Sequence, residues 1–141
     1  VPVSDPEGLL DTSAVLALSR LREPSLLPDV ALISAVTLAE LAVGPLVAAD
    51  DRERARRLAQ VQQAEADFDP LPFDAPAARA FALVAAAYRR AGRKPAARAF
   101  DAMIAATAIA NGLPLYTANP ADFAGLEGLV VRAIPSADST D

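Results

Sequence analysis

The chain has 141 residues, of which 53% are hydrophobic and 22% charged, and its formal net charge is −5. This length and composition exclude a disordered tail and favour one packed domain over residues 1–141, with its core at about residues 8–134. No apolar run approaches the ~20 residues that span a bilayer, and the first residues lack the pattern of a secretory signal peptide. We therefore expect a cytoplasmic protein.

The absence of cysteine and histidine restricts the chemistry that the chain can perform. It excludes Cys/His zinc sites, thiol nucleophiles, histidine general bases and disulfides. Carboxylates, hydroxyls, amides, arginines and the single lysine, Lys94, remain. Carboxylate and neutral oxygen ligands suit hard cations such as Mg²⁺ or Mn²⁺.

The charge is unevenly distributed along the chain. Residues 51–100 contain ten Arg or Lys and six Asp or Glu, whereas the rest of the chain contains three and twelve. A basic middle therefore lies between acidic flanks. The simplest interpretation is two solvated helix faces, unless another feature indicates a phosphate-bearing partner.

Strand and helix patterns alternate along the chain. Short buried strands are predicted at residues 8–11, 30–34, 113–117 and 129–134. Helices are predicted at residues 36–49, 52–66, 74–92 and about 95–112, with a connector or strand at 70–73 and a short turn-helix at 119–126. Asp74 is a candidate N-cap, Gly92 a stop signal and Pro95 a first-turn residue. This alternation predicts an α/β fold with a parallel sheet covered on both faces.

Polar side chains follow the first and third of these strands. The segments are Asp11-Thr12-Ser13 and Thr117-Ala118-Asn119. In parallel sheets, ligands bind at the carboxyl ends of the strands, so these residues are candidates for a site. Helix capping by Asp11 and an ordinary turn with Asn119 as cap explain the same residues without any ligand.

Two further acids fall on helix faces that are otherwise apolar or small. Glu40 shares its face with Val36, Val43 and Val47, and Asp101 shares its face with Ile104 and two alanines. An unpaired buried carboxylate costs several kcal/mol, so each acid requires a cation, a hydrogen-bond partner or a place at the edge of the core. A salt bridge from Arg98 to Asp101 would satisfy one of them.

A bound divalent ion would explain these acids together. It would neutralise repulsion between Asp11, Glu40, Asp101 and either Asn119 or Asp122 in the last strand-end loop. The small residues around Asp101 would let its helix approach the sheet closely.

The segments LLDTSA, VTLAEL and AARAFDAMIAATAIANGLPLYTANPADF, in this order, resemble a PIN domain and, within that group, VapC toxins of bacterial toxin–antitoxin pairs. The resemblance covers residues 8 to about 134. It implies a three-layer α/β/α fold with a parallel sheet, a Mg²⁺- or Mn²⁺-dependent ribonuclease, and a homodimer or larger assembly inhibited by a VapB-like antitoxin whose tail enters the active-site groove. Particular tRNA or ribosomal RNA sites are the implied substrate class.

The resemblance also implies roles for individual residues. Asp11 matches the first metal-binding aspartate, Glu40 the next acid and Asp101 the third. Many relatives carry an aspartate where this chain has Asn119, and we expect Asp122 to supply that carboxylate instead. We expect the hydroxyls of Thr12 and Thr117 to orient the ligands or bound waters.

The implied reaction is hydrolysis of an RNA phosphodiester by a metal-activated water, with Asp11, Glu40, Asp101 and Asp122 as its catalytic acids. The basic middle then becomes a candidate contact surface for RNA or for an acidic antitoxin. The leading candidates within it are Arg89, Arg90, Arg93, Lys94 and Arg98.

Two other functions remain open at this stage. One is a non-catalytic binding module on a PIN scaffold, with Asn119 a sign of a lost site. The other is a phosphotransfer domain that uses Asp11, as in haloacid-dehalogenase phosphatases or receiver domains. The first of these normally has a second aspartate where this chain has Ser13, and the second requires a lysine after a late strand, which this chain lacks.

Overall fold

The computed structural model describes residues 4–94, 96 and 98–136. Its sheet contains four parallel strands in the order β2-β1-β3-β4. They are β1 (Glu7–Leu10), β2 (Val30–Ile33), β3 (Leu115–Thr117) and β4 (Val131–Ala133). The parallel α/β fold expected from the alternating patterns is confirmed, and all four strands end at the same edge of the sheet.

The sheet is covered on both faces because neighbouring strand residues point in opposite directions. Leu9 and Leu115 pack into a core with Val84, Ile104 and the alanines of the helices α4 and α5. The next residues along the same strands, Leu10 and Tyr116, pack into a second core against the helix α1. The three-layer α/β/α arrangement is thereby confirmed. The helices concerned are α1 (Thr12–Ala17), α4 (Ala75–Arg90) and α5 (Ala99–Ala110).

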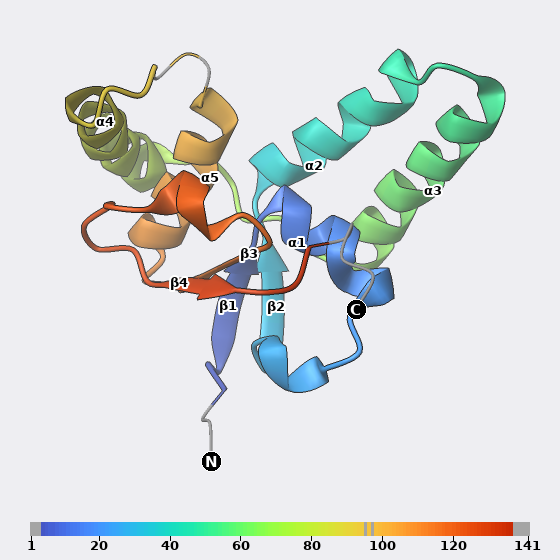
Figure 1. The fold of residues 1–141 in the computed structure, drawn as a ribbon, viewed down its shortest axis with the longest axis horizontal. Coiled ribbons are helices and arrows are strands. Elements are labelled where there is room, and N and C mark those ends of the chain that lie inside the picture. The colour runs from blue at the N-terminus through green and yellow to red at the C-terminus, as the bar shows by residue number, and fades with distance from the viewer. Residues whose placement is uncertain (1–3, 95, 97, 137–141) are drawn as a thin grey trace.

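The helix pair after β2 forms an arm that rises from the sheet (Figure 1). It consists of α2 (Ala35–Val43), a 3-10 turn at Gly44–Val47 and α3 (Asp51–Asp67). The single helix predicted at residues 36–49 is wrong, because Pro45 lacks the amide hydrogen that an α-helix needs and the chain tightens into the 3-10 turn. The helix predicted at residues 52–66 is confirmed, with Asp50 as its N-cap.

The segment between the two helix pairs is extended. Leu71, in the predicted connector, forms an isolated parallel bridge with Ser34 just beyond β2. Asp74 then caps α4 through a 3.1 Å bond from the Ala77 amide, and Gly92, with φ +78, follows the end of this helix as predicted.

The helix that carries Asp101 begins later than expected. We predicted a start near Pro95, which lies outside the described residues, but α5 begins at Ala99, directly after Arg98. Its buried face contains four alanines, Ala102, Ala105, Ala106 and Ala108. The prediction that small residues bring this helix close to the sheet is consistent with its core contacts to Leu9 and Leu115.

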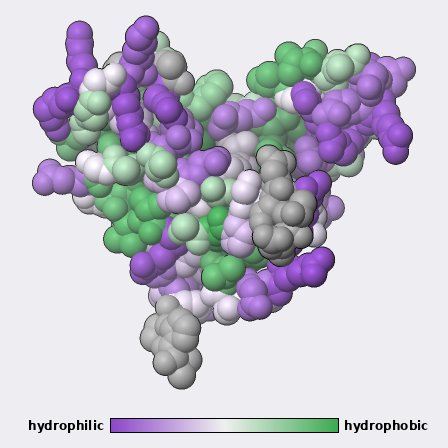
Figure 2. Space-filling view, in the orientation of Figure 1, coloured by the Kyte–Doolittle hydropathy of each residue, from purple (hydrophilic) through white to green (hydrophobic). Residues whose placement is uncertain are grey.

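The remaining elements are short 3-10 turns at Leu18–Arg20, Pro24–Leu26 and Pro120–Phe123. The last of these is the turn-helix predicted after the third strand. Hydrophilic residues cover much of the α2–α3 arm and of the region around α4 (Figure 2). Within the described part of the chain, no helix has the length and apolar character required to cross a membrane.

Candidate active site

Asp11 follows β1 directly and is the most buried of the four acids. Its side chain is 5% exposed, and its amide donates to the Tyr116 carbonyl on β3 at 3.0 Å. Oδ1 accepts from the Ala14 amide at 2.8 Å, so the capping role is real. Burial raises the pKa of Asp11 above its usual range, while hydrogen bonds from Thr117, Ser13 and Ala14 oppose the rise. Capping alone does not require a carboxylate, since a serine or threonine caps equally well.

Two hydroxyls hold the Asp11 carboxylate in place. Ser13 Oγ donates to Asp11 Oδ1 at 2.7 Å and accepts from the Ala118 amide at 2.9 Å. Thr117, fully buried at the end of β3, also bonds to Asp11 and accepts from the Asn119 amide at 2.9 Å. The structure thus places Thr117 where a supporting role was expected. Ser13 was missed as a site residue, although its position two residues after Asp11 was visible in the sequence.

Glu40 lies on α2, at the edge of the core. Its Oε1 accepts a hydrogen bond of 2.6 Å from Thr12 Oγ1, so Thr12 also lies where we expected it. Burial is the main cause of its raised pKa; the Thr12 bond opposes this and the charge of Asp11 adds to it. Val43 and Val47, on the face assigned to Glu40, are exposed, so this face leaves the core after Val36.

Asp101 lies in the first turn of α5 and is half-buried, with 31% of its side chain exposed. Its pKa is raised to about 6, mainly by burial and then by the charges of Asp122, Glu40 and Asp11, whereas Arg98 acts to lower it. The predicted salt bridge from Arg98 is present, at 3.7 Å. One long ion pair does not offset burial and three neighbouring negative charges.

Asp122 joins the cluster from the 3-10 turn after β3. Its Oδ1 lies 2.9 Å from Arg98 Nη1, whereas Oδ2 of Asp101 lies 3.7 Å from the same nitrogen. Its backbone carbonyl accepts from the Tyr88 hydroxyl at 3.0 Å and from Arg93 Nη1 at 2.8 Å, so the turn is firmly attached to α4 and its C-terminal loop. Arg98, predicted as a contact for RNA or antitoxin, therefore belongs to the acid cluster.

Asn119 lies at the start of the same turn and is exposed. Its side chain makes no capping hydrogen bond, contrary to the capping interpretation. The charges that raise the pKa of Asp101 include Asp122. This proximity favours Asp122 as the fourth carboxylate.

The other basic candidates differ in how they are engaged. Arg93 donates to the carbonyls of Ala121 and Asp122, and its guanidinium lies 5.4 Å from the centre of the Tyr88 ring. Its role is to hold the turn that carries Asp122. Arg89, Arg90 and Lys94 are exposed around the end of α4.

The donor set fits a hard divalent ion. Asp11, Glu40, Asp101 and Asp122 supply only oxygen ligands, and three of their charges act together on the fourth. Over residues 4–94, 96 and 98–136, no group of three or more acidic side chains is arranged so that it could hold a metal ion as it stands. Arg98 forms ion pairs with two of these acids, Asp101 and Asp122, and supplies positive charge next to them.

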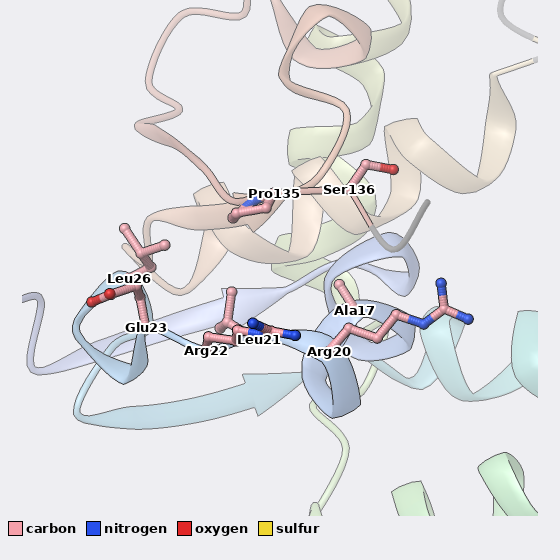
Figure 3. Close-up of a pocket in the computed structure, with 8 residues that line it drawn as sticks. All are labelled: Ala17, Arg20, Leu21, Arg22, Glu23, Leu26, Pro135 and Ser136. Carbon is pink, nitrogen blue, oxygen red and sulfur yellow. The ribbon is translucent and has the colours of Figure 1, made fainter. Parts of the chain in front are cut away.

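Two cavities lie near α1, and they differ in whether an acid of the candidate site lines them. A groove of about 580 Å³ has Thr12 and Glu40 in its wall. A smaller pocket of about 100 Å³, shown in Figure 3, lies between the segment after α1 and residues Pro135 and Ser136, and none of the four acids lines it. The groove is therefore the cavity that belongs with the candidate site.

Comparisons with known proteins show which sequences and folds this chain resembles. The chain is similar to Ribonuclease VapC5 of Mycobacterium tuberculosis, with 42% identity over 123 residues, which cover 86% of this chain and 88% of that protein. The fold is similar to the crystal structure of VapBC-5, a toxin–antitoxin system of the same organism, with a TM-score of 0.79, 37% identity and coverage of 92% and 99%.

A more distant relative shares the fold alone. It is the DNA-bound VapBC from Salmonella typhimurium, with a TM-score of 0.71, 24% identity and coverage of 93% and 98%. The sequence profile of the PIN domain matches residues 9–128, which include all four acids. With this match over most of its length, the chain belongs to the PIN domain family.

Proposed function

We propose that this protein is a divalent-metal-dependent ribonuclease and the toxin of a toxin–antitoxin pair. The observation that carries the proposal is the grouping of Asp11, Glu40, Asp101 and Asp122, from four separate segments, at the carboxyl edge of the sheet, where burial and the charges of the other three acids raise the pKa of Asp101 to about 6. Perturbed carboxylates clustered at this edge are typical of functional sites. The relative named a ribonuclease, at 42% identity, supports the choice of reaction.

The carboxylates have distinct roles in this proposal. Asp11, Asp101 and Glu40 hold Mg²⁺ or Mn²⁺, with Asp122 or Asn119 as the further oxygen ligand. When bound, the ion supplies positive charge for the phosphate and lowers the pKa of the attacking water. Ser13 and Thr117 orient Asp11, and Thr12 orients Glu40, through the hydrogen bonds described above. Exposed Arg89, Arg90 and Lys94 are the remaining candidates from the basic middle for contact with RNA or antitoxin.

The proposed partners are a VapB-like antitoxin and a second copy of the chain. The toxin–antitoxin titles of the similar structures support an antitoxin. Leu46, 83% exposed, and Val47 lie together at the tip of the α2–α3 arm and supply apolar surface for a protein contact. We further propose that residues 1–141 form one PIN domain that acts in the cytoplasm. Its substrates are loops of tRNA or ribosomal RNA.

Cleavage by the isolated chain tests this function. We expect the partner-free protein to cut structured RNA in Mg²⁺ or Mn²⁺. Asp11→Asn and Asp101→Asn should cut it more slowly by more than about 100-fold, because mutating residues that merely hydrogen-bond to metal ligands already lowers activity by about 10–100-fold. Asp69→Asn, an exposed residue outside the cluster, controls for loss of one negative charge. Equal cleavage by the wild type and both site variants would show that the acids are idle.

A non-catalytic PIN module is the second candidate. Two points favour it: Asn119 lies where the resemblance to VapC toxins leads us to expect an acid, and in the described ranges no group of three or more acids is arranged so that it could hold a metal ion. Calorimetric titration with Mn²⁺ separates the two functions. If the protein is the enzyme, it should bind Mn²⁺, and Asp101→Asn should weaken that binding. If it binds no Mn²⁺ at millimolar concentration, it is the non-catalytic module.

A further inference from the structure

The groove beside Glu40 is lined by charged residues from two sides. One wall is formed by Thr12 and Glu40 of the candidate site. Arg20 lies after α1, and Arg56, Arg57 and Gln60 lie on α3. We call this cavity, of about 580 Å³, the arginine groove. Its α3 arginines belong to the basic middle of the chain but were not among the five residues singled out there, and only the folding of the arm brings them near Glu40.

Two of these arginines share a single carboxylate oxygen. Glu53 Oε1 lies 2.6 Å from Arg56 Nη2 and 2.9 Å from Arg57 Nε. The two guanidinium groups therefore carry one more charge than Glu53 neutralises. The hydrogen bonds from Arg56 and Arg57 lower the pKa of Glu53, which keeps it ionised at neutral pH.

The two arginines differ in what else they hold. Arg57 Nη1 also donates to the Gly44 carbonyl at 3.0 Å, so Arg57 helps to fix the turn between α2 and α3. The Arg56 side chain is 62% exposed, and within the described part of the chain it pairs with Glu53 alone. Exposed ion pairs of this kind contribute little to stability. An incoming phosphate can therefore replace Glu53 at Arg56 at little cost.

Arg20 extends the positive side of the groove towards α1. It lines both the arginine groove and the small pocket of Figure 3, where its side chain extends away from Glu23 and Leu26. The adjoining cavity, of about 310 Å³, is instead mostly apolar, with Val15, Leu18 and Phe68 in its wall. The two cavities thus suit different ligands, and the arginine groove suits an anionic chain that continues into the acid cluster.

We propose that the arginine groove binds the phosphate backbone of single-stranded RNA on one side of the bond that is cut, with Arg56 and Arg57 as its phosphate contacts. This inference rests on the proposed ribonuclease function. Glu53 holds both arginines until the RNA arrives and competes with its phosphates. Guanidinium groups pair well with phosphate oxygens, and such contacts position an RNA without reading its sequence.

Binding of a fluorescent 12-nucleotide oligouridylate, measured by anisotropy in EDTA from 50 to 300 mM KCl, tests the groove. Each phosphate contact on a single strand contributes about 0.7 to the slope of log affinity against log salt. We expect Arg56→Gln to lower the slope by about 0.7 and Arg56→Gln/Arg57→Gln by about 1.4. Glu53→Gln should tighten binding, because it removes the competitor.

Charge-matched variants separate contact from general attraction. Arg52→Gln/Arg79→Gln removes two exposed arginines that do not line the groove, and we expect its salt slope to equal that of the wild type. Circular dichroism checks that the double variant, which lacks Arg57, is folded. The single variant Arg56→Gln tests the inference without disturbing the backbone, because Arg56 bonds to the Glu53 side chain.

The outcomes distinguish this inference from the function on which it rests. If wild type cleaves RNA with Mg²⁺ or Mn²⁺ but the groove and control variants lose the same affinity, the groove proposal is wrong and the ribonuclease stands. A wild type that neither binds nor cleaves RNA overturns both. If the groove variants lose affinity for an acidic peptide of glutamates while keeping that for RNA, the groove is a protein contact and the proposal is overturned.

Discussion

Carboxylates at two places on the same sheet, the acid cluster at its carboxyl edge and Asp5 with its partners Arg132 and Tyr116 (the Asp5 cluster), have opposite electrostatics. At the carboxyl edge, burial and neighbouring acids raise the pKa of Asp101. Asp5, just before β1, has its pKa lowered by hydrogen bonds from Arg132 and Tyr116, at 3.0 and 2.5 Å. Asp5 has two donors of its own, whereas Asp101 and Asp122 share one arginine, Arg98.

The difference shows which carboxylates serve the fold and which do not. Ionised Asp5 is stabilised by its partners, so folding gains from its charge. The ionised form of Asp101 is destabilised by its surroundings, so the metal-free fold loses stability to hold it. Such a cost at a clustered acid is expected where the charge serves a ligand and not the fold.

The largest effect on stability is expected at Gly8, beneath the Asp5 cluster. A Cβ added there would lie 2.5 and 2.8 Å from Cε1 and Cδ1 of the Tyr116 ring, the ring that donates to Asp5. We expect Gly8→Ala to lower the free energy of unfolding by about 2 kcal/mol, since overpacking a core costs about 1–3 kcal/mol. Urea denaturation measures the loss.

A double-mutant cycle identifies the cause of that loss. In a Tyr116→Leu background the ring is absent, so Gly8→Ala should cost less than it does alone. An equal cost in both backgrounds would mean that the ring is not what excludes a side chain at Gly8.

Asp101→Asn should have the opposite effect on stability. The folded pKa of about 6 lies above the ordinary 3.8, so the wild type loses stability as the pH rises from about 4 to above 6. We expect Asp101→Asn to be more stable at pH 7 in EDTA by about 1–2 kcal/mol, allowing for the exposed part of the side chain. Urea denaturation at pH 4 and pH 7 measures the gain, which should nearly vanish at pH 4.

Asp69→Asn, an exposed carboxylate outside both clusters, is the matched control and should change stability little at either pH. If Asp101→Asn is less stable than the wild type at pH 7, the Asp101 carboxylate supports the fold, and the contrast with Asp5 fails.

Asp5→Asn should produce the smallest change, with the sign expected of a supporting carboxylate. Its pKa is lowered, so its contribution is present above the ordinary value of 3.8 and is lost as the pH falls through the folded value. The loss at pH 7 should be below about 1 kcal/mol, because the ion pair with Arg132 is exposed. Denaturation at pH 7 and pH 3 measures it, and a larger loss at pH 3 would exclude this assignment.

Much of the fold could be predicted from local patterns. Leu9 and Leu10 belong to a short apolar run, and the alternation of such runs with helical segments indicated a parallel sheet. The arm was predicted less well, because Pro45 ends α2 within a stretch that is apolar on nearly every face. The start of α5 was misplaced, because Pro95 is a good first-turn residue but the helix begins only at Ala99.

The candidate site was predicted where a residue type conflicts with its local pattern. An acid on an apolar helix face is costly, and that cost singled out Glu40 and Asp101. Ser13 was missed because a hydroxyl near a helix start fits capping equally well. The bond from Ser13 to the Ala118 amide joins residues 105 positions apart, and no local pattern contains it.

The sequence by itself determined the order of strands and helices, the buried alanine face of α5 and the acids available for chemistry, because these follow from hydrophobic period and residue type. Tertiary structure decided which charges meet. It paired Arg98 with Asp122, 24 residues away, and brought α3 to the side of Glu40. Electrostatic interactions depend on distance through space, which the chain acquires only when its helices pack against the sheet.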